Sequence, residues 1–327
     1  MIQRFTLIIS LFAMLTLVSC QSDVIVPTLA QLSTPVPTQI TPTMTATFTP
    51  TSTVTEAATA TLTPSPTITD TPGVIIQISL TPSDTPIPPP PTQTATPLPE
   101  AFTFGHSAQG RDLLAYRFGT GQHIILLAGG IHAGFEANTV DLMNELRSHF
   151  ALNPQAIERD VTLLIVPAFN PDGLTFGRVI RGRFNGNQVD LNRNWGCDWS
   201  ENAEFNNGAV DPGAEPFSEP ETTALGSLIQ RVQPAAVMFY HAAANGIFAG
   251  DCETGGVSDE LAQIYGEASR YPYGEAFSAY RVTGTAVSWI DGLGIPAVDV
   301  ELASSSETEF NRNLQAILAV QQWIVGR

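Results

Sequence analysis

The sequence predicts an α/β fold for residues 101–327: a single α/β/α domain with a mixed, largely parallel central sheet flanked by helices. Two observations support this. Four apolar runs have the length of buried strands, and segments with helical spacing lie between them. Strands that alternate with helices are typical of a layered domain with a parallel core. Composition delimits this region, because all five histidines and every one of the fourteen basic residues except Arg4 follow residue 100.

The elements can be assigned in chain order. The predicted strands are HIILLAGG (123–130), VTLLIVPAF (161–169), AAVMFYHA (235–242) and IPAVDVELA (295–303). The predicted helices are 136–150, 219–232, 259–271 and 309–325. One domain of this length can bury a substantial core, so no second folded domain is needed.

The first twenty residues predict a signal peptide. Arg4 provides a positive charge, and the largely apolar run Phe5–Val18 is too short for a comfortable membrane span. The run ends in LVSC (17–20), which resembles the lipobox of bacterial lipoproteins and implies lipidation of Cys20. An uncleaved anchor or an ordinary secretory signal is the alternative. We therefore expect a protein outside the cytoplasm, lipid-anchored to the cell membrane or secreted.

Residues 21–100 predict a disordered linker. Thr and Pro dominate, as in TPTMTATFTPTSTVTEAATATLTPSPTITDTP, and few large apolar side chains are present to offset the entropy of ordering. The composition favours an extended stalk, partly in the polyproline II conformation. At about 3.1 Å per residue, such a stalk would hold a domain on the order of 200 Å from the membrane.

The charge of the chain excludes nucleic acid as a partner. At a net charge of −17, phosphate groups would be repelled, and binding them needs clustered Lys or Arg. We expect a monomer.

Polar side chains follow the predicted strands. His132 comes after the first run, His241 ends the third, and Glu301 lies near the end of the fourth. Active sites of open α/β sheets gather at the carboxyl ends of their strands. Two histidines and a carboxylate suit a single catalytic zinc ion, which takes three protein ligands and keeps a fourth position open.

Each of these residues also has a purely structural explanation. A lone histidine after a strand is usually a hydrogen-bonded core or rim residue. Glu136 is a favourable first-turn acid near a helix N-terminus. Glu301, in the stretch VDVE, suits the polar face of an alternating edge strand.

The segments between these residues resemble the zinc carboxypeptidase family, of the carboxypeptidase A and B type, across residues 104–325. GHSAQGR (105–111) is similar to the segment that opens the family's domain, and GGIHAGFE, VPAFNPDG and RFNGNQVDLNRNW follow in order. The last, at 183–195, is the most specific match. The resemblance implies a zinc metallocarboxypeptidase that hydrolyses the C-terminal peptide bond of peptides.

The resemblance implies a role for each site residue. It gives zinc ligands (His132, Glu136, His241), a general base (Glu301), an oxyanion stabiliser (Arg183), binding groups for the substrate carboxylate (Asn192, Arg193), a tyrosine that closes over the substrate (Tyr280) and an aspartate that orients a ligand imidazole (Asp190). The residue types suit these roles, because a planar guanidinium matches a carboxylate and a fixed cation stabilises a developing oxyanion.

Two positions depart from the family's pattern or leave it open. The family's first ligands are spaced His-x-x-Glu, whereas one extra residue separates His132 from Glu136. Both spacings keep two side chains on one face of a helix, and Gly134 can absorb the insertion in a loop. Val287 matches the floor of the specificity pocket and favours an apolar terminal side chain, while Arg281 leaves an acidic substrate open.

Cys197 and Cys252 predict a disulfide, because an oxidising compartment allows them to pair. Two free thiols are the alternative.

Three other functions remain open. A peptidoglycan stem-peptide amidase or carboxypeptidase on the same fold suits a surface lipoprotein. An N-acyl amino-acid deacylase fits the carboxylate-binding residues less well. A non-catalytic surface binding module predicts loss of a metal ligand or of the base.

Overall fold

The computed structural model describes residues 100–252 and 256–327. The predicted signal peptide with Cys20, and the predicted linker up to residue 99, lie outside these residues. Within the part of the chain that is described, no helix combines the length and the apolar character needed to cross a membrane.

The elements follow one another as strands and helices along the domain. The strands are β1 (Ala101–His106), β2 (Asp112–Gly119), β3 (His123–Ala128), β4 (Val161–Val166), β5 (Glu204–Phe205), β6 (Gly208–Ala209), β7 (Ala236–Ala242), β8 (Gly246–Ala249) and β9 (Ala297–Leu302). The helices are α1 (Ala137–Leu152), α2 (Pro171–Leu174), α3 (Pro220–Val232), α4 (Asp259–Ser269), α5 (Ala286–Asp291) and α6 (Phe310–Val325). Short 3-10 helices are η1 (Pro154–Ala156), η2 (Ile180–Arg183) and η3 (Leu191–Arg193).

Seven strands form one mixed sheet in the order β1-β2-β4-β3-β7-β9-β8. Its centre is parallel, because β3 pairs in parallel with β4 and β7, and β7 with β9. Antiparallel strands complete both edges: β2 and β1 on one side, β8 on the other. The carboxyl ends of β3, β7 and β9 therefore meet at one edge of the sheet, as expected for the predicted site.

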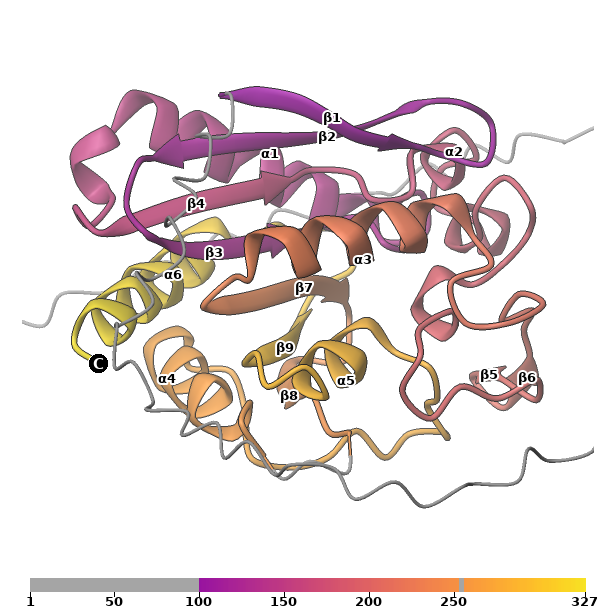
Figure 1. Cartoon of the computed structure of the whole chain (residues 1–327). Helices are drawn as coiled ribbons and strands as arrows, with labels where there is room; N and C mark the ends of the chain where they lie inside the picture. The colour runs from indigo at the N-terminus through magenta and orange to yellow at the C-terminus, as the bar shows by residue number, and fades with distance from the viewer. Residues whose placement is uncertain (1–99, 253–255) are drawn as a thin grey trace, which may run out of the picture. The chain divides into compact units, whose positions relative to one another are not determined.

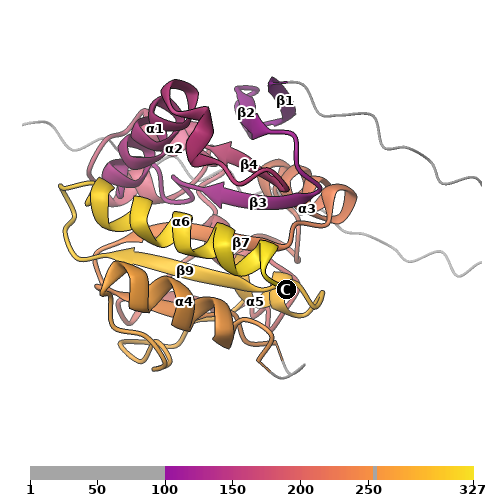
Figure 2. The same cartoon turned by 90° about the vertical axis from the view of Figure 1, so that its left-hand side faces the viewer.

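Helices cover both faces of the sheet. Helices α1, α4 and α6 share one apolar core with the side chains on one face, and Figure 2 looks onto these helices. Helices α3 and α5 share a second core with the opposite face, in front of the sheet in Figure 1. The predicted α/β/α fold is confirmed.

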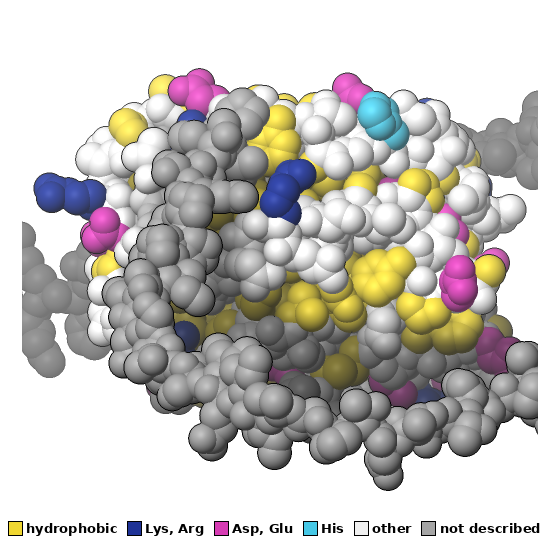
Figure 3. Space-filling view, in the orientation of Figure 1, with side chains coloured by type: hydrophobic (Ala, Val, Ile, Leu, Met, Phe, Trp, Pro, Cys, Tyr) yellow, Lys and Arg dark blue, Asp and Glu magenta, His cyan; other side chains and the backbone are white. Residues whose placement is uncertain are grey.

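In the orientation of Figure 1, Figure 3 shows basic side chains scattered over the visible face rather than gathered in a patch.

The four predicted strands and the four predicted helices are all present, with small shifts at their ends. The third long helix stops at Ser269 because Arg270 adopts a left-handed conformation, at φ 62°. The sequence did not predict β1, β2 or β8, whose residues are partly exposed and lack a continuous apolar run. The edge-strand explanation of Glu301 is wrong, since β9 has neighbours on both sides.

Candidate active site

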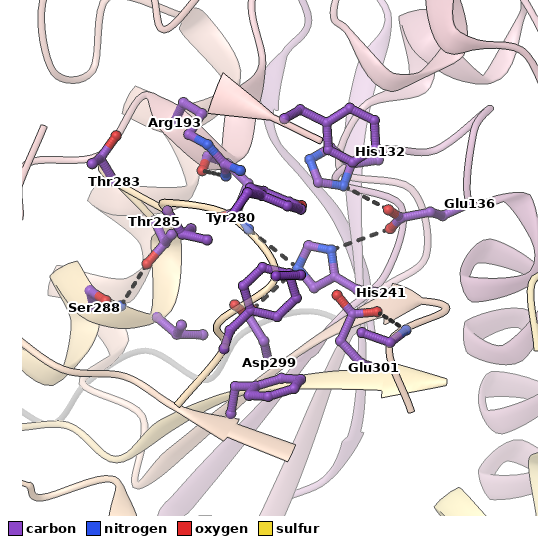
Figure 4. Close-up of a pocket in the computed structure, with 18 of the residues that line it drawn as sticks. His132, Glu136, Arg193, His241, Tyr280, Thr283, Thr285, Ser288, Asp299 and Glu301 are labelled. Atoms are coloured by element: carbon purple, nitrogen blue, oxygen red, sulfur yellow. Dashed lines mark hydrogen bonds and ion pairs between the residues drawn. The ribbon is translucent and has the colours of Figure 1, made fainter. Parts of the chain in front are cut away.

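A cavity of about 790 Å³ opens at the carboxyl ends of β3, β7 and β9. Its lining brings together residues that lie far apart in the chain, and Figure 4 shows several of them pointing into the same space. Every residue to which the sequence assigned metal binding, catalysis or substrate binding lines it: His132, Glu136, Arg183, Asn192, Arg193, His241, Tyr280, Val287 and Glu301.

His132, Glu136 and His241 form a potential metal site. One ligand atom from each residue can be chosen so that all lie within 4.8 Å of one another. The three residues are 2%, 5% and 3% exposed, so of the structural explanations for the histidines burial excludes the rim position but not a hydrogen-bonded core position. Glu136 is the N-cap of α1 but makes no capping hydrogen bond with its side chain. Its carboxylate instead faces both imidazoles, whose Nδ1 atoms lie 3.0 Å (His132) and 3.2 Å (His241) from its oxygens.

A single backbone turn sets the spacing of the first two candidate ligands. The amide of Glu136 donates to the carbonyl of His132 at 2.9 Å, which is the hydrogen bond of one helical turn. Both side chains therefore project from the same side. Gly134 makes the turn possible by its size, because a Cβ there would lie 2.3 Å from the carbonyl oxygen of Gly173.

The donor set fits a zinc ion. In each histidine Nδ1 faces the shared carboxylate, while Nε2 lies beside another carboxylate: 3.1 Å from Asp190 for His132, and 3.2 Å from Asp299 for His241. Carboxylates at the far ring nitrogen are what orients metal-binding imidazoles and keeps the near nitrogen free for the metal. Two imidazoles and one carboxylate are a common ligand set of catalytic zinc.

The charges in the site are strongly coupled. Burial works against the ionised carboxyl of Glu136, but the two histidines outweigh it and lower its pKa. Burial likewise works against the charged form of His241, yet Asp299 and Glu136 raise its pKa well above the ordinary value. Imidazoles bind a metal ion in their neutral form, so metal binding at this site would be coupled to pH.

Glu301 lies on β9 beside the metal site. Its Oε2 accepts a hydrogen bond from the amide of Ala244 at 3.0 Å. Burial raises the pKa of the Glu301 carboxyl to about 7, with His241 opposing and Glu136 adding to this shift. A carboxyl that titrates near neutral pH is suited to accept and return a proton.

Arg183 is a buried cation fixed next to the candidate ligands. Its Nε donates to Asp190 at 2.8 Å, and its Nη1 lies 3.3 Å from Nδ1 of His132. Its guanidinium carbon stacks 3.8 Å from the ring centroid of Phe205. Burial opposes ionisation of Asp190, but Arg183 and His132 outweigh it and hold the pKa of Asp190 well below its usual range. The ion pair thus places a permanent positive charge at the edge of the metal site.

Arg193 presents a fork to the cavity. Its Nε and Nη2 donate to the carbonyl of Glu204, and its Nη1 donates to the carbonyl of Asn192. Each terminal nitrogen carries two N–H groups and donates one hydrogen bond in the structure, so one N–H on each remains for another acceptor. The Asn192 side chain is held by the amide of Ala286, which donates to its Oδ1 at 3.0 Å.

Aromatic residues surround Tyr280. Its ring meets those of Phe205 and Phe277 edge to face, with centroids 5.7 and 4.9 Å apart. Burial raises the pKa of its hydroxyl, while Arg183 and Arg193 oppose this shift, so Tyr280 is a neutral donor at ordinary pH.

Of the two residues to which the sequence linked substrate preference, Val287 and Arg281, only one lines the cavity. Val287 is buried in the first turn of α5 and lines the cavity, as the resemblance implied. Arg281 is exposed and is not part of the lining, so it offers no site for an acidic substrate in this arrangement.

Cys197 and Cys252 form a disulfide with Cα atoms 6.0 Å apart. Cys197 itself lines the cavity. The bond therefore ties the loop after η3 to the segment after β8, on the wall of the site.

Sequence reasoning missed two residues of the site. Phe205 lies in a two-stranded ribbon that carries no apolar run, and its position under Arg183 depends on tertiary structure. Asp299 was detectable, because it lies two residues before Glu301 on a strand and must share its face.

Comparisons with known proteins identify the family of the chain. A family model described as zinc carboxypeptidase matches residues 93–321. The chain is 30% identical over 209 residues to murein peptide amidase A of Escherichia coli strain K12, which covers 61% of this chain and 79% of that protein. It is 28% identical over 246 residues to murein peptide amidase A of Vibrio campbellii, covering 71% and 92%.

Solved structures show the same fold. The murein-tripeptide amidase of Escherichia coli O157 is 26% identical with a TM-score of 0.52, covering 72% of this chain and 96% of that one. Bovine thrombin-activatable fibrinolysis inhibitor, solved in complex with tick carboxypeptidase inhibitor, is 18% identical with a TM-score of 0.59, covering 69% and 90%.

Proposed function

The chain belongs to the zinc carboxypeptidase family, and from this premise we propose that it is a zinc-dependent hydrolase that removes the C-terminal residue of peptides. One observation carries the proposal: a potential metal triad, the carboxyl of Glu301 and the guanidinium of Arg193 line a single cavity.

The ligands we propose for one zinc ion are His132, Glu136 and His241, whose converging atoms and buried environment support it. A zinc ion held by these residues would supply Lewis-acid chemistry for hydrolysis of the peptide bond. The carboxylate of Asp190 lies 3.1 Å from Nε2 of His132 and holds the imidazole ring. This contact leaves Nδ1 of His132 directed at Glu136.

Glu301 takes the proton from the attacking water and returns it to the leaving amine. The proposal is supported by its place beside the metal site and by its raised pKa. Arg183 remains charged and lies next to the site, where it stabilises the negative charge that develops on the carbonyl oxygen. Removal of one such group typically costs roughly 3 to 4 kcal/mol in the transition state.

Arg193 and Asn192 bind the terminal carboxylate of the substrate, which directs the last peptide bond toward Glu301 and Arg183 in the same cavity. The free N–H on each terminal nitrogen of Arg193 supports this role. Tyr280 contributes a neutral hydroxyl above the bound residue.

Activity on matched peptides tests the proposal. Zinc-loaded protein should release the last residue from a peptide acid, and should act at least about 100-fold more slowly on the same peptide with a C-terminal amide, because the charge-assisted fork is lost. Arg193→Lys should lose most of this discrimination, since an ammonium does not bind a carboxylate bidentately. Release of internal fragments, or equal rates on acid and amide, would contradict the proposal.

A second candidate is supported by the relatives. Because murein peptide amidase A of Escherichia coli shares 30% identity with the chain, we infer that the physiological substrate is a cell-wall stem peptide. Purified muropeptides and ordinary peptides of equal length should be compared by kcat/KM. A preference for ordinary peptides would reject this substrate while leaving the hydrolase proposal intact.

We also propose that the domain acts outside the cytoplasm on a lipid anchor at Cys20. Metabolic labelling with a fatty-acid analogue should mark the wild type but not Cys20→Ser, and the variant should move from the membrane fraction to the medium. Labelling of both proteins would reject the lipid anchor.

A further inference from the structure

Arg178 is a cation of the cavity to which the proposed reaction assigns no role. It lies in the segment between α2 and η2 and lines the cavity, as does Ser305 in the segment after β9. Its Nη1 donates a hydrogen bond to the backbone carbonyl of Ser305. This contact joins two segments of the wall and keeps the guanidinium at the edge of the cavity.

Arg178 lies at the end of the cavity remote from Arg193. The side chain of Asn138, in the first turn of α1, donates to two backbone carbonyls of the segment that contains Ser305. This segment, and Arg178 with it, therefore lies near the start of α1, where Glu136 is the N-cap. Figure 4 shows Glu136 and Arg193 on opposite sides of the two histidines. A peptide held by its terminal carboxylate at Arg193 therefore extends past the potential metal site toward Arg178.

The charge of Arg178 has no carboxylate partner within residues 100–252 and 256–327. In this part of the chain, the arginines that pair with a carboxylate are Arg111, Arg183, Arg312 and Arg327. A guanidinium has five N–H groups, and the contact with Ser305 uses one of them. Arg178 is exposed, so its remaining N–H groups can reach an incoming ligand. Such a cation binds carboxylates through charge-assisted hydrogen bonds.

Two aromatic rings lie at the same end of the cavity. Phe135 directly precedes Glu136, and its ring meets that of Phe205 edge to face, with centroids 5.7 Å apart. Both rings line the cavity and are half-buried. Apolar groups lower the effective dielectric constant around a charge, which strengthens an ion pair. A carboxylate bound by Arg178 is therefore screened less than one on an open surface.

We propose that Arg178 is a specificity-determining residue that selects substrates with a carboxylate on one of the two residues before the scissile bond. This inference rests on the proposed function, because Arg193 must hold the terminal carboxylate and so set the direction of the peptide. The two arginines then bind one substrate at two points, on either side of the two histidines. The hydrogen bond to Ser305 positions the guanidinium for this contact and does not itself select a substrate.

Glutamate and glutamine provide the matched pair of probes, since their side chains differ only in the carboxylate. Peptide acids of one length should carry either residue at the first or the second position before the scissile bond. At one of these positions, the glutamate-to-glutamine ratio of kcat/KM should be about 3 to 10 in the wild type, as expected for a partly screened ion pair. In Arg178→Gln this ratio should fall to about 1. The ratio is the readout, because loss of the contact with Ser305 would change both rates by a common factor.

Arg181→Gln is the matched control, because it removes the same charge from the same segment. Arg181 does not line the cavity, and its guanidinium carbon stacks 4.6 Å from the ring centroid of Phe176. This variant should keep the wild-type ratio. A wild-type ratio of about 1 at both positions would overturn the proposal. So would an unchanged ratio in Arg178→Gln, or an equal loss of the ratio in Arg178→Gln and Arg181→Gln.

Binding separates this inference from the proposed function. Calorimetry of zinc-loaded Glu301→Gln protein with the same peptides requires no turnover. Binding of a glutamate peptide that is tighter by about threefold or more, and that loses this advantage when Arg178→Gln is added, supports the inference. If the wild type hydrolyses neither peptide in that case, only the proposed function fails. Equal binding of glutamate and glutamine peptides at both positions rejects the inference even if hydrolysis is observed.

Discussion

Nδ1 of His132 lies 3.0 Å from Oε1 of Glu136, although three residues separate them in the chain. The extra residue relative to the family's His-x-x-Glu spacing thus leaves both side chains on one turn. Glu136→Gln should therefore lower zinc affinity by at least about 100-fold, more than loss of an outer-shell group costs.

Metal analysis after dialysis against a competing chelator measures this loss. Glu145→Gln is the matched control, because Glu145 is exposed on the same helix α1. If Glu136→Gln held zinc as firmly as Glu145→Gln, Glu136 would not be a ligand.

The raised pKa of Glu301 predicts a pH dependence. Burial raises the pKa of this carboxyl to about 7 in the metal-free protein, and a divalent cation beside it lowers that pKa again. The base must be ionised, so kcat/KM should fall as pH decreases through a pKa below about 7.

Glu301→Gln should lose about 10²- to 10⁴-fold in kcat and retain zinc. The pH–rate profile and metal content together check the assignment. An acid limb that persists unchanged in the residual activity of Glu301→Gln would show that another group titrates.

Asp190 predicts a pH-dependent stability. Its depressed pKa means that the folded state favours the ionised form, so this stabilisation is complete above the unfolded pKa of about 3.9 and is lost as pH falls toward the folded pKa. At pH 7, Asp190→Asn should cost about 3 to 5 kcal/mol, because it leaves Arg183 buried without its partner.

Urea unfolding from pH 8 down to 3 measures the difference from wild type, which should be constant until about pH 4 and then shrink. Asp141→Asn, at an exposed position of α1, should show no comparable loss. A difference that does not depend on pH at all would assign the loss to packing.

The disulfide predicts a redox-dependent stability. It closes a loop with a sequence separation of 55 residues, for which the chain-entropy model gives about 4 kcal/mol. Replacing Cys197 and Cys252 by Ala should lower the free energy of unfolding by roughly 2 to 5 kcal/mol.

Reductant should lower the urea midpoint of the wild type toward that of the double variant and leave the variant unchanged. Equal midpoints for oxidised and reduced wild type would show that the bond does not constrain the unfolded chain.

The centre of the fold was predictable because β3, β4 and β7 are buried along nearly their whole length. Such strands form continuous apolar runs. The β1–β2 hairpin was not predicted, since most of its side chains are exposed or half-buried and Gly105 lies within β1. Its position against the sheet depends on pairing with β4, a contact far along the chain.

The candidate site was predictable to the extent that topology determines it. Strand ends that meet at one edge bring together His132, His241 and Glu301. The position of Asp299 follows from its spacing to Glu301, but its contact with Nε2 of His241 arises only from the pairing of β7 with β9. The position of Phe205 under Arg183 likewise arises from packing alone.

A backbone contact at Gly134 fixes the distance between two segments of the site. The amide of Gly134 donates to the carbonyl of Gly182 at 3.1 Å, and Gly182 directly precedes Arg183. A Cβ on Gly182 would lie 2.3 Å from the carbonyl oxygen of Gly177. A larger residue at either glycine would therefore strain the two backbone segments or push them apart. The separation between the turn that carries His132 and Glu136 and the residue Arg183 is thus set by a backbone hydrogen bond. Replacing either glycine by alanine should lower kcat/KM, although the substitution removes none of the polar side chains of the site.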